Sequence, residues 1–422
     1  MSVDSAAPGV SPRAFAYRDY RFFWTAVGLT SFAAQIMGIA VALQVYLLTH
    51  DQFMLGLVGL ATFTPALLLV LVTGYVADRF NRRLIMAIAG TAELCSAIAL
   101  MIYTASGSTE VWPVFVILAI IGTARAFTSP AGSSLAPNVV PPEALASAIS
   151  LNASAWQMAN IMGPVVGGVL ASISLQLAFG TAGLFSAAAV GCVLMIRAPK
   201  QKISDQATSI GTLLAGFRYI WHEKVVLGAI SLDLFAVLLG GATALLPVFA
   251  LDILDVGPAG LGFMRAAAGL GAIPTALVLA RSPVRDHAGH ILFTFVALFG
   301  FFTFLFALSP TIWLSFPLLM LMGACDMVSV SIRETLMQLW TPDEVRGRVN
   351  AVNSVFIGAS NELGEFRAGA MGKIIGTLVG SSPLGAIVAV ATGGIATMAV
   401  AGLWSLGFPK LREARRLDRR EA

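Results

Sequence analysis

Eight charged side chains interrupt long apolar stretches of this 422-residue chain: Glu93, Arg125, Asp233, Arg265, Asp326, Glu362, Glu365 and Arg367. An isolated charge at bilayer depth costs about 2.5 kcal/mol or more, so such groups usually face a cavity and pair. Glu362 and Glu365 are three residues apart and therefore share one helix face. In a shared cavity of low dielectric constant they could not both ionise cheaply, which makes them candidates to carry a proton, as are the two aspartates. The alternative is a structural ion pair with Arg265 or Arg367.

Uncharged polar residues in the same stretches could orient a solute: Gln35, Gln44, Gln157, Asn160 and Asn361. Each could equally form a hydrogen bond between helices. The three cysteines lie singly in apolar runs, and the four histidines fall in predicted loops without metal-ligand spacing. We therefore expect no metal site, no disulfide and no cofactor.

The composition indicates which solvent surrounds these side chains. Only 11% of the residues are charged and 57% are hydrophobic, whereas a soluble domain has about 25% charged residues. Twelve runs reach the roughly 20 apolar residues that a spanning helix needs. They are 22–48, 54–76, 84–105, 112–134, 144–171, 175–197, 225–250, 259–281, 289–309, 312–337, 346–372 and 384–408. Because these runs are too long for barrel strands, the sequence predicts an all-α membrane protein with twelve transmembrane helices.

Lysine and arginine predict the orientation. An even number of spans puts both termini on one side, and 21 of the 26 basic residues fall in the loops and tails of that side. The opposite loops carry acidic residues and essentially no basic one. By the positive-inside rule, both termini of this multi-pass protein of the inner or plasma membrane are cytoplasmic. The basic residues form no stripe with interleaved aromatics, which argues against a nucleic-acid partner.

A polar stretch divides the chain into two halves. We expect a cytoplasmic tail over 1–21, a six-helix bundle over 22–197, a linker over 198–224, a second six-helix bundle over 225–408 and a basic tail over 409–422. Apolar residues at helical spacing in 210–223 predict an amphipathic helix at the cytoplasmic interface. Gly122-x-x-Arg125 and Gly323-x-x-Asp326 are 201 residues apart, which indicates a duplicated unit. Two pseudo-symmetric bundles of this kind enclose a site near the midplane.

The loop between the second and third runs carries Gly74, Asp78, Arg79, Arg82 and Arg83 in the pattern G-x-x-x-D-R-x-x-R-R. It resembles the corresponding loop of the major facilitator superfamily, a family of solute transporters. The resemblance implies that Asp78 meets the start of helix 11, where the helix dipole favours a carboxylate. It also implies that the arginines pair with acidic groups such as Asp343 and Glu344 and so close the cytoplasmic side. On the alternative interpretation the arginines only fix the topology.

Two further segments narrow the resemblance. Gly163, Pro164, Gly167 and Gly168 resemble a glycine-proline segment in helix 5 of proton-driven drug antiporters, although a kink packed closely against helix 8 would explain them equally well. The segments 342–350 (PDEVRGRVN) and 360–366 (SNELGEF) resemble the branch that contains the enterobactin exporter and related secretion transporters. The chain departs from that pattern at Arg367, where an acid is expected, and this alters the charge balance of helix 11.

The resemblance implies a secondary active transporter that exports an amphipathic small molecule, such as a drug or a siderophore. It implies proton antiport with alternating access, in a monomer whose partners are the solute, protons and the lipid bilayer. The alternatives are a lysophospholipid flippase and an importer of a small organic solute. A membrane-embedded enzyme would need a clustered nucleophile, base or metal site, and an ATP-driven pump a phosphate-binding glycine loop; the sequence shows neither.

Overall fold

The computed structural model describes residues 14–197, 210–284 and 286–413, and every regular element in these ranges is helical. The first half opens with a short turn, η1 (Ala14–Ala16). Its six long helices are α1 (Arg18–Thr49), α2 (Gln52–Arg79), α3 (Arg82–Ala105), α4 (Trp112–Leu135), α5 (Leu145–Ile173) and α6 (Leu175–Met195). The turns η2 (Ala136–Asn138) and η3 (Pro142–Ala144) join α4 to α5. These helices are apolar nearly all round, as helices must be when they face lipid and one another.

The second half follows α7 (Ile210–His222) and has the same number of spans. The first of them is interrupted and consists of α8 (Lys224–Gly240), η4 (Thr243–Leu245), α9 (Leu246–Val248) and the π-helical η5 (Phe249–Ile253). The others are α10 (Gly257–Arg281), α11 (Ala288–Ala307), α12 (Ile312–Trp340), α13 (Asp343–Val379) and α14 (Ser382–Gly407), followed by α15 (Pro409–Arg412).

Ten segments of the described chain are long and apolar enough to cross a membrane. The other two long helices are α5 and α13, of 29 and 37 residues, which carry more polar side chains. Helix α5 packs against α1 and α10, and α13 packs against α2 and α14. The protein is thus an all-α membrane protein of two six-helix bundles, in agreement with the twelve expected spans.

The span expected over 225–250 is present as Lys224–Ile253, but it is not one continuous helix. Helix α8 ends at Gly240, Gly241 leaves helical geometry, and the chain resumes at Thr243. Two consecutive glycines are poor helix formers and allow the interruption. A hydropathy pattern cannot detect this break, because the residues on both sides are equally apolar.

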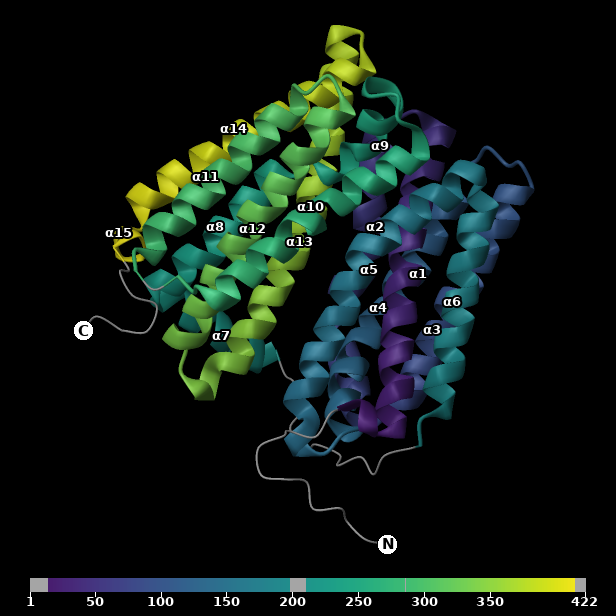
Figure 1. Cartoon of the computed structure of the whole chain (residues 1–422), viewed down its shortest axis with the longest axis vertical. Helices are drawn as coiled ribbons and strands as arrows, with labels where there is room; N and C mark the ends of the chain where they lie inside the picture. Colours follow the sequence, from purple (N-terminus) through teal and green to yellow (C-terminus); the bar gives the residue numbers. More distant parts are fainter. Residues whose placement is uncertain (1–13, 198–209, 285, 414–422) are drawn as a thin grey trace, which may run out of the picture.

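The two bundles meet at one end of the molecule and diverge at the other. A single hydrophobic core at the meeting end includes Tyr46 of α1 and Phe249 of η5. At the other end the buried side chains form separate clusters, one around Tyr20 in the first half and one around Leu336 in the second. Figure 1 shows the bundles spreading apart toward the end where α1 begins and α14 finishes. We call the two ends the closed end and the open end.

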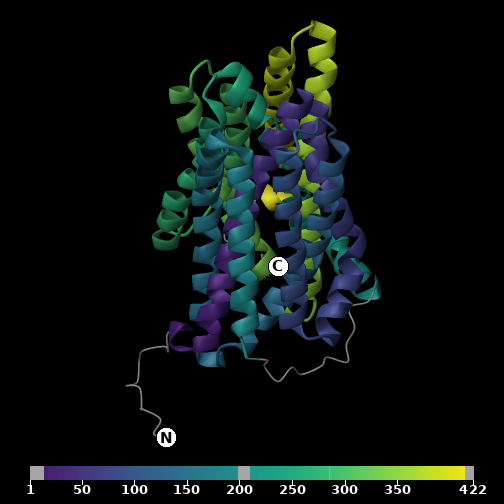
Figure 2. The same ribbon diagram turned by 90° about the vertical axis from the view of Figure 1, so that its right-hand side faces the viewer.

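Figure 2, turned by 90°, shows the helices of the first bundle running along the long axis of the molecule. Helix α7 packs on the open-end start of α13. Gly216 lies against the backbone of Arg348, and the rings of Phe217 and Phe356 stack with centroids 6.5 Å apart. Phe217 and Trp221 remain exposed. The helix expected in the linker is therefore present and is attached to the second bundle, whereas residues 1–13, 198–209 and 414–422 of the expected tails and linker lie outside the described residues.

Candidate functional site

A cavity lies between the two halves and is lined by residues of both. Arg125 of α4 reaches it from the first half, and Arg265 of α10 reaches it from the second. Glu362 and Glu365 of α13 complete a group of four charged side chains. Many of the other lining residues are apolar side chains of the first half, among them Met37, Val41, Leu55, Val58, Leu118 and Ile121. The cavity therefore presents both positive and negative charges beside apolar surface.

Glu362 occupies the point where the halves touch. Its carboxylate lies directly on Gly59 of α2, at a place where even an added methyl group on Gly59 would collide with Oε2. Glu362 also interacts electrostatically with Glu365, Arg265 and Arg125. Glu362, a side chain of the second half, thus interacts with charged groups of both halves. A change of its charge would therefore act on the contact between the halves.

Arg125 also lies near the carboxylate of Glu93, which is in the interior of the first bundle. Its Nε lies 3.9 Å from Oε1 of Glu93 on α3. Glu93 is only 4% exposed, and Oε1 accepts no hydrogen bond from the described protein atoms. A buried carboxylate with a single distant cation is weakly compensated. Glu93 and Arg125 therefore form a charge pair with one member inside the first bundle and one member on the cavity.

The two aspartates of the candidate set lie away from this cavity. Asp233 of α8 pairs with Arg333 of α12, within the second bundle, and both side chains are largely buried. Asp326 of α12 is exposed and does not line the cavity. The structure thus separates the eight charged candidates into a central group and a group confined to the second bundle.

Arg367 points into the interrupted span. Its Nε donates to the carbonyl of Leu238 at 3.0 Å, in the last turn of α8. Thr397 of α14 donates to the carbonyl of Ala236 at 3.0 Å. The carbonyl of Leu238 lies in the last turn of α8 and has no partner within the helix, so the guanidinium of Arg367 stabilises this helix end. Thr397 adds a second bond to a carbonyl just before that turn. Arg367 consequently stabilises the interruption between α8 and η4.

The uncharged polar candidates serve mainly to join helices within the first half. Gln35 of α1 donates to Asn160 of α5, and Gln44 donates to Thr104 at 2.8 Å. Gln157 is half-buried and Asn361 is exposed. None of these five is among the residues that line the central cavity, whereas Thr62 and Thr243, which the sequence did not single out, are.

The arginines of the 74–83 loop all contact their own bundle. Arg79 donates to the hydroxyl of Tyr75 at 2.8 Å, Arg82 to the carbonyl of Ser134 at 2.9 Å, and Arg83 to the carbonyl of Leu194. Gly74 is half-buried in α2.

On the facing half, Asp343 pairs with Arg346 of the same helix at 2.6 Å. The side chains of Asp78 and Glu344 lie outside the described residues. This arrangement agrees with the divergence of the bundles at the open end.

The halves touch through two glycine crossings. A Cβ added at Gly168 of α5 would lie 2.6 Å from the carbonyl oxygen of Pro258 and 2.8 Å from Cα of Gly262 on α10. A Cβ added at Gly369 of α13 would lie 2.9 Å from the nitrogen of Gly56 on α2. Gly369 follows Gly168 by 201 residues, so the two crossings are related by the internal repeat.

The other small residues of the same helix segment face elsewhere. Gly163 and Gly167 pack on α1, where a Cβ at Gly167 would lie 3.0 Å from Cα of Ile36. Pro164 lies inside α5, and its carbonyl approaches Gly262. The glycine-proline segment thus packs closely against both α1 and α10.

Comparison with known proteins identifies the family. A family model described as transmembrane secretion effector matches residues 10–403. The chain belongs to this family. It is 25% identical over 358 residues to the enterobactin exporter EntS of Shigella boydii serotype 18, a match covering 83% of this chain and 84% of that protein. The same exporter of Escherichia coli O139:H28 is 24% identical over equal lengths.

Solved structures share the fold at low sequence identity. A bacterial homologue of the human lysosomal transporter Spinster, in an inward-facing and unoccupied conformation, superposes with a TM-score of 0.69 at 14% identity, covering 96% of this chain and 98% of that chain. A D-xylose-proton symporter superposes with a TM-score of 0.70 at 11% identity, covering 92% and 97%. The chain therefore has the major facilitator fold, and its family and fold are those of multi-pass membrane transporters of small molecules.

Proposed function

We propose that this protein exports an amphipathic small molecule by proton antiport, through alternating access between its two bundles. The observation that carries the proposal is the central cavity, where Arg125 from one half meets Arg265, Glu362 and Glu365 from the other. A charged cavity between two pseudo-symmetric bundles is the geometry of a carrier. Its apolar lining residues suit the hydrophobic part of a solute, and its charges suit a polar or ionised part.

The names of the relatives support export as the direction of transport. The matched proteins of Shigella boydii and Escherichia coli are named as exporters of enterobactin. Export requires loading from the cytoplasm, which would be the open end if that end faces inward. Basic residues gather there, at the end of α2, the start of α3, the end of α10 and the start of α13. The positive-inside rule assigns such an end to the cytoplasm, together with both termini.

We propose that Glu362 and Glu365 couple proton transfer to solute transport. Glu362 and Glu365 lie on one face of α13, and Arg265 is the cation that interacts with both. Two adjacent carboxylates compete for one cation and for protons, so occupancy by a proton or by a solute changes the charge at the contact with α2. Closure of the open end would then bring the 74–83 loop, including Asp78, to the start of α13.

Inside-out membrane vesicles test the proposal. Respiring vesicles acidify their lumen, and addition of enterobactin or ethidium should release protons, seen as recovery of a quenched acridine dye. The E362Q/E365Q double variant, expressed to the same level, should show no recovery because it cannot exchange a proton at this site. Equal recovery in vesicles that lack the protein, or solute uptake without proton release, would count against proton-coupled export.

A further inference from the structure

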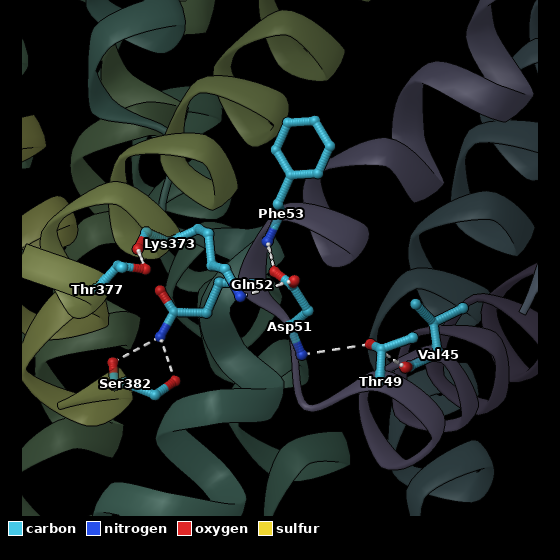
Figure 3. Close-up of polar contacts among 8 residues, drawn as sticks. All are labelled: Val45, Thr49, Asp51, Gln52, Phe53, Lys373, Thr377 and Ser382. Carbon is cyan, nitrogen blue, oxygen red and sulfur yellow. Dashed lines mark hydrogen bonds and ion pairs between the residues drawn. The ribbon is translucent and has the colours of Figure 1, made fainter. Parts of the chain in front are cut away.

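A second set of polar contacts joins the two halves, at the closed end. The turn between α1 and α2 belongs to the first half, and the turn between α13 and α14 belongs to the second. Figure 3 shows side chains of the first turn reaching α13 and α14. The Oδ2 atom of Asp51 lies 2.9 Å from Nζ of Lys373. Gln52 Nε2 donates to the carbonyl of Ser382 at 2.6 Å and lies 3.0 Å from its hydroxyl.

The first-half side of this contact is held rigidly by local bonds. The other carboxylate oxygen of Asp51 accepts from the backbone N–H of Phe53 at 2.9 Å and caps α2. The backbone N–H of Asp51 donates to the hydroxyl of Thr49 at 3.3 Å, and that hydroxyl donates to the carbonyl of Val45. A carboxylate fixed in this way faces its partner without a large loss of side-chain entropy on pairing.

The second-half side lies at two helix ends. Lys373 is in the penultimate turn of α13, and its side chain is half-exposed. Ser382 is the first residue of α14. Lys373 is also the basic residue that the loop count overlooked, because the predicted helix 11 ended one residue before it.

Other contacts between the halves surround these pairs. The hydroxyl of Tyr46, a fully buried residue of α1, donates to Asp252 of η5. The rings of Phe53 and Phe366 meet edge to face with centroids 5.5 Å apart. The described ion pairs of Arg346 and the described bonds of the 74–83 arginines, in contrast, stay within one half. Polar contacts between halves are thus concentrated at the closed end.

We propose that Asp51 with Lys373, and Gln52 with Ser382, form a polar latch that holds the closed end shut and opens when the transporter exposes its cavity on that side. The proposal rests on the alternating access proposed above. A half-exposed ion pair contributes little stability, up to about 1 kcal/mol, so it can bias the equilibrium between two states and still break in every cycle. The glycine crossings and the shared apolar core would then set the geometry of closure, and the latch its stability.

Distances between spin labels test the latch without a transport assay. In a background without the three native cysteines, one pair of labels at Thr109 and Val379 reports the closed end, and a second pair at Ser133 and Ser282 reports the open end. Asp51→Asn is the sharpest variant, because asparagine still caps a helix but carries no charge. Two populations are compared: protein in which the closed end has opened, with a long label distance there, and protein in which it remains shut. We expect Asp51→Asn and Lys373→Met each to raise the ratio of opened to shut protein by about five-fold, the equivalent of about 1 kcal/mol.

The matched control is Glu110→Gln, which removes a carboxylate from an exposed loop at the same end. Lys373→Arg keeps the cation and should keep the wild-type distances. Unchanged closed-end distances in both single variants, in protein that remains monodisperse, would overturn the latch. If one single variant does not fold, the same criterion applies to the other single variant, with Lys373→Arg as the control that keeps the charge. If the closed-end distances change in the variants as expected but the wild-type protein releases no protons in the vesicle assay, the latch is supported and the proposed proton-coupled export is rejected.

Discussion

At the scale of single residues, the proposed proton antiport requires a carboxylate whose charge acts on the contact between the two halves. Glu362 sits on Gly59 of the opposite half and interacts with cations of both halves. Losing or gaining its charge therefore alters the contact between α2 and α13 directly. Glu93, although buried and poorly compensated, touches only its own bundle through Arg125. The geometry favours Glu362 as the coupling residue over Glu93.

The first prediction concerns this residue. Glu362→Gln keeps the shape of the side chain but cannot release a proton, so proton-driven accumulation should fall to the level of passive exchange. Exchange of labelled for unlabelled solute should persist, because it needs no proton. Both quantities are measurable in proteoliposomes. Glu413→Gln, an exposed carboxylate near the open end, is the control and should behave as wild type. Loss of exchange and accumulation together would show that Glu362 only supports folding or solute binding.

Part of the site could be predicted from the sequence, for a clear physical reason. A charge in an apolar run is costly, so Arg125, Arg265, Glu362 and Glu365 stood out, and all four line the cavity. The sequence could not show which charges converge, since Asp233 lies on an equally apolar run but pairs with Arg333 inside its bundle. Lys373 and Asp51 were not recognised as partners, because polar residues at helix ends are ordinary and 322 positions separate them.

At the scale of helices, the two glycine crossings govern how closely the halves approach. Gly168 on α5 meets Gly262 on α10, and Gly369 on α13 meets Gly56 on α2. In lipid no hydrophobic effect drives helices together, so close packing at small residues supplies much of the attraction. The four spans concerned are the ones through which the halves make most of their contact at the closed end.

The second prediction follows from this packing. Gly168→Ala should destabilise the protein by about 1–3 kcal/mol, because the added methyl group meets backbone atoms that cannot rotate away. The matched control is Gly191→Ala on α6, where nothing lies within 4 Å of the added atom. That change should be neutral or stabilise by about 0.5–1 kcal/mol, since alanine is the better helix former. Thermal unfolding in detergent measures both, and equal midpoints would contradict the tight crossing.

Helix positions were the most predictable part of the fold. Apolar run length gave starts and ends within a few residues for α3, α4 and α6, because a helix cannot end inside hydrocarbon, where its last backbone groups would lack hydrogen-bond partners. The exception is the span after α7, which breaks at Gly240 and continues as η4, α9 and η5. The carbonyl of Leu238, which the break leaves without a helical partner, accepts from Arg367 of a later helix. A break that depends on distant partners cannot be read from a local pattern.

At the scale of the whole molecule, the two ends differ in how the halves contact each other. The closed end has one core that spans both halves and polar contacts between them, whereas the open end has a separate core in each half. A protein that works by alternating access needs a second state in which this asymmetry is reversed. The basic loop over 74–83 and the start of α13 are the surfaces available for that state at the open end.

The last prediction is that the open end faces the cytoplasm, which decides the direction from which a solute enters the cavity. Thr109 follows α3 at the closed end, and Ser282 follows α10 at the open end; both are exposed. In a cysteine-free background, Thr109→Cys should react with a membrane-impermeant maleimide in intact cells whose outer barrier has been removed. Ser282→Cys should react only after the membrane is permeabilised. The reason is electrostatic, because loops rich in arginine and lysine are retained on the inside during insertion. The reverse labelling pattern would place the closed end in the cytoplasm and contradict the predicted topology.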